Sequence, residues 1–417
     1  MFRSFLFSLF FVFSLFIQAQ TETPKNDSIK RVDLLKEIGQ GFLPSTFFKF
    51  DLRYLVKYNQ YEGFRSGIGG ITNDDFSKKF RINSYIVYGF VDQTIKYSVG
   101  GGYKIAEKTN TWLNYSYTDD LTETGSTQFI LDKRFFQFFE PRLLNINLFH
   151  RHVSNKVTIE HEITPKLLGE FQVSVNNIEP KYNYAYNLDN VSYREFGTSI
   201  GKFAIQWMPF TEIDSETNKI TKDGFPKFTL QYTKSFKDVF DANFNFSKTD
   251  LRIVHKLNYK KPEAFSLITF TSGYAHGDTP ITDMYHAYPN NINKETIGQR
   301  FSVAGINSFE TMYFNEFFSD RFSTLILKHY FEPFHFGKKF NPQLVLINRF
   351  AIGDMNNTER HQGINFGTLE KGYTEAGFEL NKLLFGFGLS TTYRYGAYHL
   401  PLEEDNIALK FTFNITL

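Results

Sequence analysis

Apolar and polar side chains alternate along the last twelve residues of the chain, Asn406 to Leu417. The apolar positions are Ile407, Leu409, Phe411, Phe413, Ile415 and Leu417. A period of two places them all on one face of a β-strand, and about ten such residues are enough for a strand that crosses a membrane in a barrel. An exposed edge on so long a strand would pair with other chains, whereas a barrel pairs its last strand with its first.

We therefore predict that this segment closes a transmembrane antiparallel β-barrel by pairing with a first strand within Phe50–Asn59. Phe411, Phe413 and Leu417 would then face lipid, and Thr412 would face the lumen. An amphipathic strand of a soluble sandwich would show the same local pattern and is the alternative for this segment.

The same alternation recurs in segments from about residue 50 onward. In Ile95–Ile105 and Val153–Ile163, for example, apolar residues occupy most alternate positions. Between Ala242 and Tyr259 the apolar phase changes, which predicts either a bulge within one strand or a hairpin at Lys248–Asp250. We count roughly fourteen to eighteen strands and predict sixteen, because barrels of single bacterial chains favour an even number.

Connections between the predicted strands come in two lengths. Short turns are expected at Asp92–Gln93 and Pro165–Lys166. Long polar connections are expected over residues 118–134, 179–195, 211–226, 276–300 and 354–371. Short periplasmic turns and long outer loops are typical of an outer-membrane barrel.

The N-terminus has the pattern of a secretory signal peptide. Arg3 is followed by the apolar run Phe5–Ile17 and by a small residue, Ala19, and the run is too short for a spanning helix. We predict a signal peptide over residues 1–20, a periplasmic segment over 21–49 with a short helix at Ile29–Ile38, and a barrel over 50–417. A retained N-terminal anchor is the alternative.

Composition agrees with export into an outer membrane. The chain has no cysteine, so neither disulfides nor a thiolate metal site can stabilise it. Aromatic residues make up 18% of the chain, with 50 Phe and 24 Tyr, as a lipid-facing band with aromatic girdles requires. Mean hydropathy is −0.33 and no later apolar run reaches helix-spanning length, which excludes a helical membrane protein. A net charge of +2 with no basic stripe excludes a nucleic-acid partner.

Candidate catalytic and metal-binding residues are scattered. His150 and His152 share one strand face, but no carboxylate spacing completes a metal site with them or with His161. Gly100–Gly102 is not a phosphate loop, because no Lys-Ser/Thr pair follows it. We therefore predict no catalytic residue, no metal and no cofactor.

Several short stretches resemble one uncharacterised Bacteroidetes outer-membrane barrel family. Many members of that family carry an N-terminal carboxypeptidase-regulatory-like domain, which this chain lacks. The resemblance covers most of residues 50–417. It rests on Asn59–Arg65, Gly69–Asn73, Phe76–Lys78, Tyr88–Asp92, Lys96–Tyr97, Phe340–Leu344, Thr368–Gly372 and Tyr393–Gly396.

A more distant resemblance is to the bacterial surface-antigen superfamily, the barrels of outer-membrane assembly factors and two-partner secretion transporters. Ser308–Met312, Asn315–Phe317 and Asp320 are similar to its inward loop, and Gly388–Pro401 is similar to its final hairpin. The chain departs from that pattern. Glu310 and Thr311 replace the usual Arg-Gly pair of the loop, and no periplasmic polypeptide-binding repeats precede the barrel.

In that superfamily the loop arginine meets an acidic residue on the wall. Here Leu344, Leu346, Phe350 and Ile352 occupy the lipid face of a later strand, so parity turns Arg349 inward. We therefore predict a charge-reversed ion pair between Glu310 on the loop and Arg349 on the wall. The alternative is that Glu310 faces water in an outer loop.

Three functions are consistent with these observations. The first is a non-catalytic outer-membrane barrel of surface-antigen type with an assembly, transport or envelope-structural role in a Gram-negative bacterium. The second is a passive solute pore, and the third is a barrel hydrolase that acts on lipid. The expected partners are outer-membrane lipid, the barrel assembly machinery during insertion, and other envelope proteins.

Overall fold

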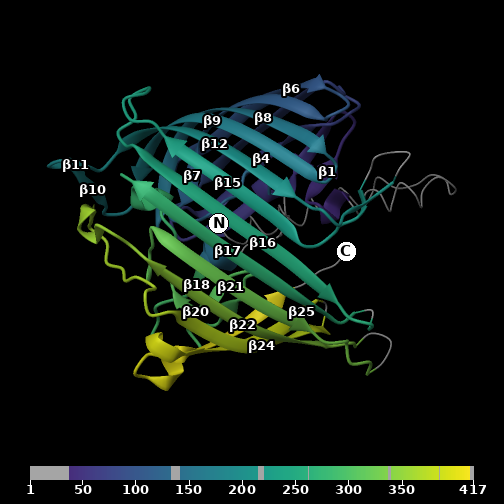
Figure 1. The fold of residues 1–417 in the computed structure, drawn as a ribbon, viewed down its shortest axis with the longest axis vertical. Coiled ribbons are helices and arrows are strands. Elements are labelled where there is room, and N and C mark those ends of the chain that lie inside the picture. Colours follow the sequence, from purple (N-terminus) through teal and green to yellow (C-terminus); the bar gives the residue numbers. More distant parts are fainter. Residues whose placement is uncertain are drawn as a thin grey trace, which may run out of the picture.

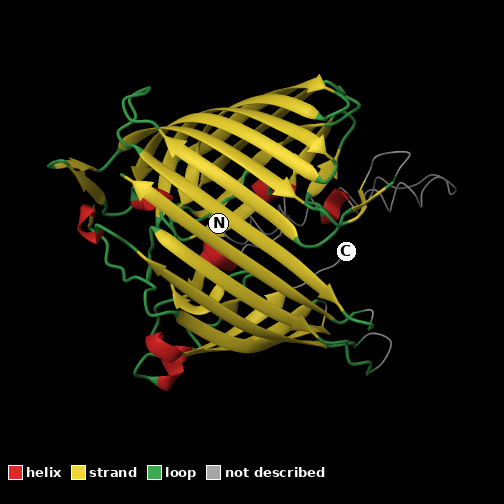
Figure 2. Ribbon diagram, in the orientation of Figure 1, coloured by secondary structure: helices red, strands yellow, loops and turns green. Residues whose placement is uncertain are grey.

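In the computed structural model, one antiparallel sheet is curled into a barrel whose strands are steeply tilted (Figures 1 and 2). The structure describes residues 37–132, 141–214, 220–261, 263–336, 340–384 and 386–413. The predicted signal peptide and Leu417 lie outside these residues. Of the predicted short helix, only the last turn, at residues 37–39, lies within them. No helix in the described part of the chain is long and apolar enough to span a membrane.

Sixteen strands form the wall, as the sequence predicts. The sheet has nineteen strands, but β1 (Phe42–Pro44) and β19 (Ser302–Val303) are short edge segments, and β2 and β3 are two halves of one strand. In order around the wall the strands are β2 (Phe48–Asp51) with β3 (Val56–Asn59), β4 (Gly63–Thr72), β5 (Phe80–Gly89), β6 (Ile95–Ala106), β7 (Thr111–Glu123), β8 (Phe149–Thr164), β9 (Leu167–Pro180), β12 (Phe196–Trp207), β15 (Lys227–Ser235), β16 (Phe246–Asn258), β17 (Phe265–Gly277), β21 (Arg321–Tyr330), β22 (Gln343–Asp354), β24 (Tyr373–Leu384), β25 (Phe387–Tyr395) and β26 (Ile407–Phe413).

Side chains alternate between the two faces of the wall, and the outward set is largely apolar. On β22, Leu346, Phe350 and Ile352 are exposed, whereas Arg349 between them is buried. On β26, Leu409 and Phe411 are exposed, and the residues between and beyond them point inward and are buried, as predicted. Phe413 is the last residue of β26, and the structure describes its backbone only.

The two ends of the barrel differ. One end, which we call the terminal end, holds the start of β2, the last residues of β26 and the short Pro165–Lys166 turn. The other, the loop end, holds long connections over residues 124–148, 181–195, 278–320 and 355–372. Two predicted placements were wrong. The short turn at Asp92 lies at the loop end, and residues 211–226 lie at the terminal end, where β13 (Glu212–Ile213) pairs with β14 (Ile220–Lys222).

The loop end is filled by an apolar core, which we call the cap. Phe244 lies between Tyr186 and Phe196 in edge-on ring contacts of 5.0 and 5.1 Å. A small sheet supports it, in which β10 (Ala185–Leu188) pairs with both β11 (Val191–Tyr193) and β23 (His361–Gln362). Burial, with a further contribution from the Arg360 charge, lowers the pKa of His361 to about 4, so the ring is neutral where it meets the Tyr184 hydroxyl at 3.0 Å.

The cap also explains the phase change between Ala242 and Tyr259. β16 keeps one register with β15 and β17 over its whole length, so neither the predicted bulge nor the hairpin is present. Phe246 points inward into the cap, whereas Leu251 and Ile253, nearer the terminal end, point outward. The apolar positions change face because the inner face of the wall is apolar under the cap and polar below it.

The last strand does not pair with the first among the described residues. β26 pairs with β25 on one side and, in parallel, with the short β19 on the other. The first strand carries β1 along β2, paired antiparallel. The described part of β26 therefore does not make the predicted pairing with Phe50–Asn59, and at Lys410 and Phe411 its free edge is taken by a segment of the chain's own inward connection.

Candidate functional site

The connection from β17 to β21 folds back against the inner face of the wall. We call residues 278–320 the inward segment. It includes η3 (Ile281–Asp283), β18 (Pro289–Asn291), β19 and β20 (Phe309–Tyr313), and β18 pairs in parallel with β20. β20 contacts β25 and β26, and β19 extends the sheet edge at β26. The segment thus lies against the last strands of the wall.

Glu375 on β24 holds the backbone of β20. One of its carboxylate oxygens accepts a hydrogen bond from the Glu310 N–H at 2.9 Å, and the other accepts bonds from the N–H and hydroxyl of Thr311 at 2.9 and 2.5 Å. Arg349 on β22 donates to the same carboxylate at 2.6 Å, and both charged side chains are fully buried. A charged acceptor with four protein donors fixes β20 more firmly than neutral bonds would.

Glu310 and Lys410 form a second buried pair. The Lys410 ammonium on β26 lies 3.4 Å from the Glu310 carboxylate and also donates to the Asn290 carbonyl and the Ser302 hydroxyl. Glu310 accepts further hydrogen bonds from Asn290 and Ser308, each at 2.7 Å. One lysine of the last strand therefore joins three parts of the inward segment.

Two more arginines complete the attachment. Arg394 on β25 donates to both carboxylate oxygens of Glu316, at 2.7 and 3.2 Å, and its guanidinium lies 4.7 Å from the centre of the Tyr373 ring. Arg300, just before β19, pairs with Asp405 at 2.8 Å, ahead of β26. The inward segment is therefore joined by charged groups to three consecutive strands, β24, β25 and β26.

The predicted residues lie in one network but do not pair directly. Glu310 is on the inward segment and Arg349 points inward, both as predicted, and both are buried. Arg349 nevertheless pairs with Glu375, and Glu310 pairs with Lys410. The prediction of a direct ion pair between Glu310 and Arg349 was therefore wrong. The reason is register, because Glu375 lies directly opposite Arg349 on the neighbouring strand, with 2.6 Å between their charged atoms.

Sequence reasoning missed Glu375 and Lys410. Lys410 was visible as a charge on the inward face of the last strand, and Glu375 as an acid on the inward face of the strand through Ala376 and Phe378. What alternation cannot supply is which inward charges share a neighbourhood, because that depends on strand order and stagger around the barrel.

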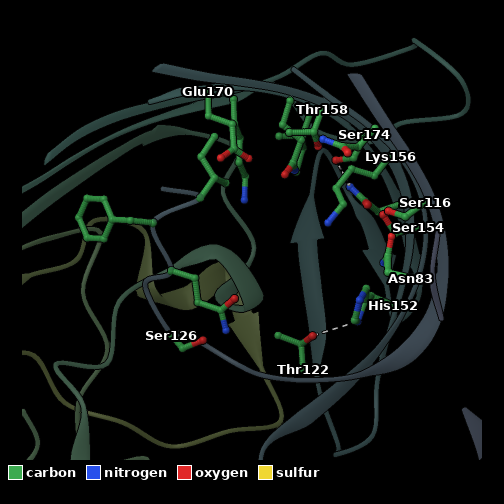
Figure 3. Close-up of a pocket in the computed structure, with 18 of the residues that line it drawn as sticks. Asn83, Ser116, Thr122, Ser126, His152, Ser154, Lys156, Thr158, Glu170 and Ser174 are labelled. Atoms are coloured by element: carbon green, nitrogen blue, oxygen red, sulfur yellow. Dashed lines mark hydrogen bonds between the residues drawn. The ribbon is translucent and has the colours of Figure 1, made fainter. Parts of the chain in front are cut away.

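The other half of the lumen is a polar cavity of about 760 Å³, enclosed mainly by strands from β4 to β16 (Figure 3). Figure 3 shows the side chains that point into it, most of them hydroxyls and amides with a few charges. They include Asn83, Ser116, Ser154, Lys156, Thr158, Glu170 and Ser174.

Exposure along the cavity wall shows where it opens. At the loop end the lining residues Ile178 and Thr198 are 7% and 1% exposed, and Ile178 belongs to the cap. Toward the terminal end, the lining residue Asn83 is exposed, and the side chain of Glu160 is 41% exposed. The cavity is therefore covered by the cap and opens toward the terminal end.

The histidines that face this cavity are held by hydroxyl groups. His150 meets Thr124 at 3.1 Å, and His152 meets Thr122 at 2.9 Å (Figure 3 shows the second contact). Within the described ranges, no group of three or more His, Asp or Glu side chains is placed to hold a metal ion.

No protein-family model and no curated protein matches this sequence. The fold is similar to that of a solved structure of BamA from Haemophilus ducreyi lacking POTRA domains 1–3, with a TM-score of 0.53 and 10% identity over 94% of this chain and 79% of that one. A weaker likeness, with a TM-score of 0.43 and 10% identity over 85% of this chain and 57% of that chain, is to CdiB from Acinetobacter baumannii. The likeness to BamA concerns the fold alone, a large barrel of antiparallel strands.

Proposed function

We propose that this chain is an integral outer-membrane barrel with a non-catalytic role in assembly, transport or envelope structure, and that residues 1–20 direct its export. The outward face of the wall supports the membrane location, because large apolar side chains are exposed on it from β3 to β26. In water an exposed apolar surface of this extent would aggregate, whereas in lipid it is the solvated face.

The attachment of the inward segment to the wall is the observation that favours this proposal over a passive pore. Four buried charges, Glu310, Arg349, Glu375 and Lys410, hold this segment against the wall, and the cap covers the cavity beside it. A pore for small solutes needs a continuous aqueous path between its two ends. A lumen with a fixed inward segment and a covered end is suited instead to a barrel that works through its wall or through partners at its terminal end.

Ion conductance in planar bilayers tests this proposal. We expect the purified full-length protein to show no steady open-channel current, because the inward segment and the cap interrupt the path. A stable, ohmic single-channel conductance in the unmodified protein would support the solute-pore alternative. Incubation with phospholipid or lipopolysaccharide, with release of fatty acid as the readout, tests the hydrolase alternative in the same preparation.

Membrane location and partners are tested together. We expect the chain to fractionate with outer membranes and to migrate differently on gels before and after heating, as folded barrels do. Crosslinking at the terminal end before purification would show whether envelope proteins bind there. Recovery in the soluble periplasmic fraction would contradict the membrane location.

A further inference from the structure

Three lysines on the cavity wall lack a directly paired anion in the described part of the chain. Lys156 on β8, Lys202 on β12 and Lys248 on β16 all line the cavity. Among the described residues, none of the three forms an ion pair or a side-chain hydrogen bond, although Lys248 lies 4.4 Å from the centre of the Tyr285 ring. Figure 3 shows Lys156 projecting from the wall among Ser154, Thr158 and Ser174.

Strand register brings the three lysines together. Lys202 lies opposite Thr233, and Thr233 lies opposite Lys248, so the two lysines are two strands apart at one level. Lys156 lies opposite Ser174, and Ser174 lies opposite Ile200. Lys156 is therefore one inward-facing position nearer the loop end than Lys202. Neighbouring strands are about 4.8 Å apart, so the flexible lysine stems can bring their ammonium groups to one ligand.

Three carboxylates of the same cavity lie within electrostatic range of these lysines but form no direct ion pair with them among the described residues. Glu170 is near Lys156, and Asp250 and Asp283 are near Lys202. Asp250 accepts hydrogen bonds from the Tyr285 hydroxyl at 2.7 Å and from Gln231 at 3.4 Å. Asp283 accepts a bond from Thr282 at 3.1 Å, and neither it nor Glu170 forms an ion pair with a lysine. Partly buried ammonium groups without a directly paired anion are costly, and a bound anion would offset part of that cost.

We propose that Lys156, Lys202 and Lys248 form a binding site for an oxyanion group, phosphate or carboxylate, on a small hydroxylated solute that enters from the terminal end. Neutral hydrogen-bonding side chains surround the lysines and suit the hydroxyl groups of such a solute. They include Ser154, Thr158, Gln172, Ser174, Thr198 and Thr233. A volume of about 760 Å³ is within the range of small-molecule sites.

Inorganic phosphate is the first probe, measured by calorimetric titration of the full-length protein in detergent at constant ionic strength. We expect saturable binding that Lys202→Gln weakens by about ten- to hundredfold, as the loss of one charge-assisted hydrogen bond implies. Lys104→Gln is the control, because Lys104 lies on the inner side of β6, 5.0 Å from the Trp112 ring centre and away from the cavity lining. We expect it to leave phosphate affinity unchanged.

Titrations with other ligands identify the class of molecule that supplies the oxyanion. Glucose 6-phosphate, citrate and a water-soluble short-chain phosphatidic acid are titrated beside glucose, which lacks the charge. Tighter binding of one anion than of glucose identifies its class and supports the proposal. Absence of saturable binding by every anion, or equal loss in the Lys202 and Lys104 variants, would overturn it. Lys156→Gln gives a second reading if the Lys202 variant does not fold.

Discussion

Replacing Glu375 with Gln is expected to lower the free energy of unfolding by about 3–5 kcal/mol, because it removes one partner of a fully buried charge pair. Arg349 would keep its charge at zero exposure without its anion, and two of its guanidinium nitrogens already have no hydrogen-bond partner among the described residues. β20 would also lose a charged acceptor. Urea unfolding of the lipid-reconstituted protein measures the cost.

The matched control is Asp354→Asn. Asp354 pairs with Arg321 across β21 and β22, but both side chains are more than a third exposed. An exposed pair contributes about 0–1 kcal/mol, so this variant should remain close to the unmodified protein. Limited proteolysis should cut residues 278–320 faster in the Glu375 variant only. Equal unfolding midpoints for the two variants would contradict a structural role for the buried network.

The second large effect is expected on the lipid face. Val99→Arg, near the middle of β6, should cost about 2–4 kcal/mol in a folding titration into vesicles, because it places a charge in hydrocarbon. Val99 is 56% exposed on the outer face of the wall. The same position in a soluble sheet would tolerate arginine with little loss.

Asn83→Arg is the control for the lipid face. Asn83 is on the neighbouring strand, β5, and points into the polar cavity, where a charged head can stay hydrated (Figure 3). Thr412 on β26 also faces inward but is unsuitable as a control, because it is only 5% exposed and has no room for an arginine. If both variants fold equally well, the outer face of this barrel does not contact lipid.

The partners found in the buried network determine which exchange of charges should restore stability. Exchanging Glu310 and Arg349 is not expected to restore stability, because each has a different partner. Exchanging Glu310 and Lys410 instead keeps opposite charges 3.4 Å apart and should recover part of the loss from either single change.

The alternation of apolar and polar residues in the sequence was sufficient to predict a barrel-type sheet. A period of two identifies the face of each residue, and for Arg349, Leu409 and Phe411 it predicted the side that the structure shows. Counting alternating segments gave only a range for the number of wall strands, and the preference of single bacterial chains for an even number selected sixteen, as observed. Where the lumen becomes apolar under the cap, at Phe244 and Phe246, the same rule failed, because alternation separates two faces but does not say which one is wet.

Only the tertiary structure decided which inward charges meet. Glu375 lies opposite Arg349 because β22 and β24 are adjacent with a particular register, and Lys410 reaches Glu310 because the connection over residues 278–320 returns to the last strand. Lys156, Lys202 and Lys248 line one cavity for the same reason, although 92 residues separate the first from the last. Such contacts depend on stagger, closure and the path of a long connection, none of which a local pattern encodes.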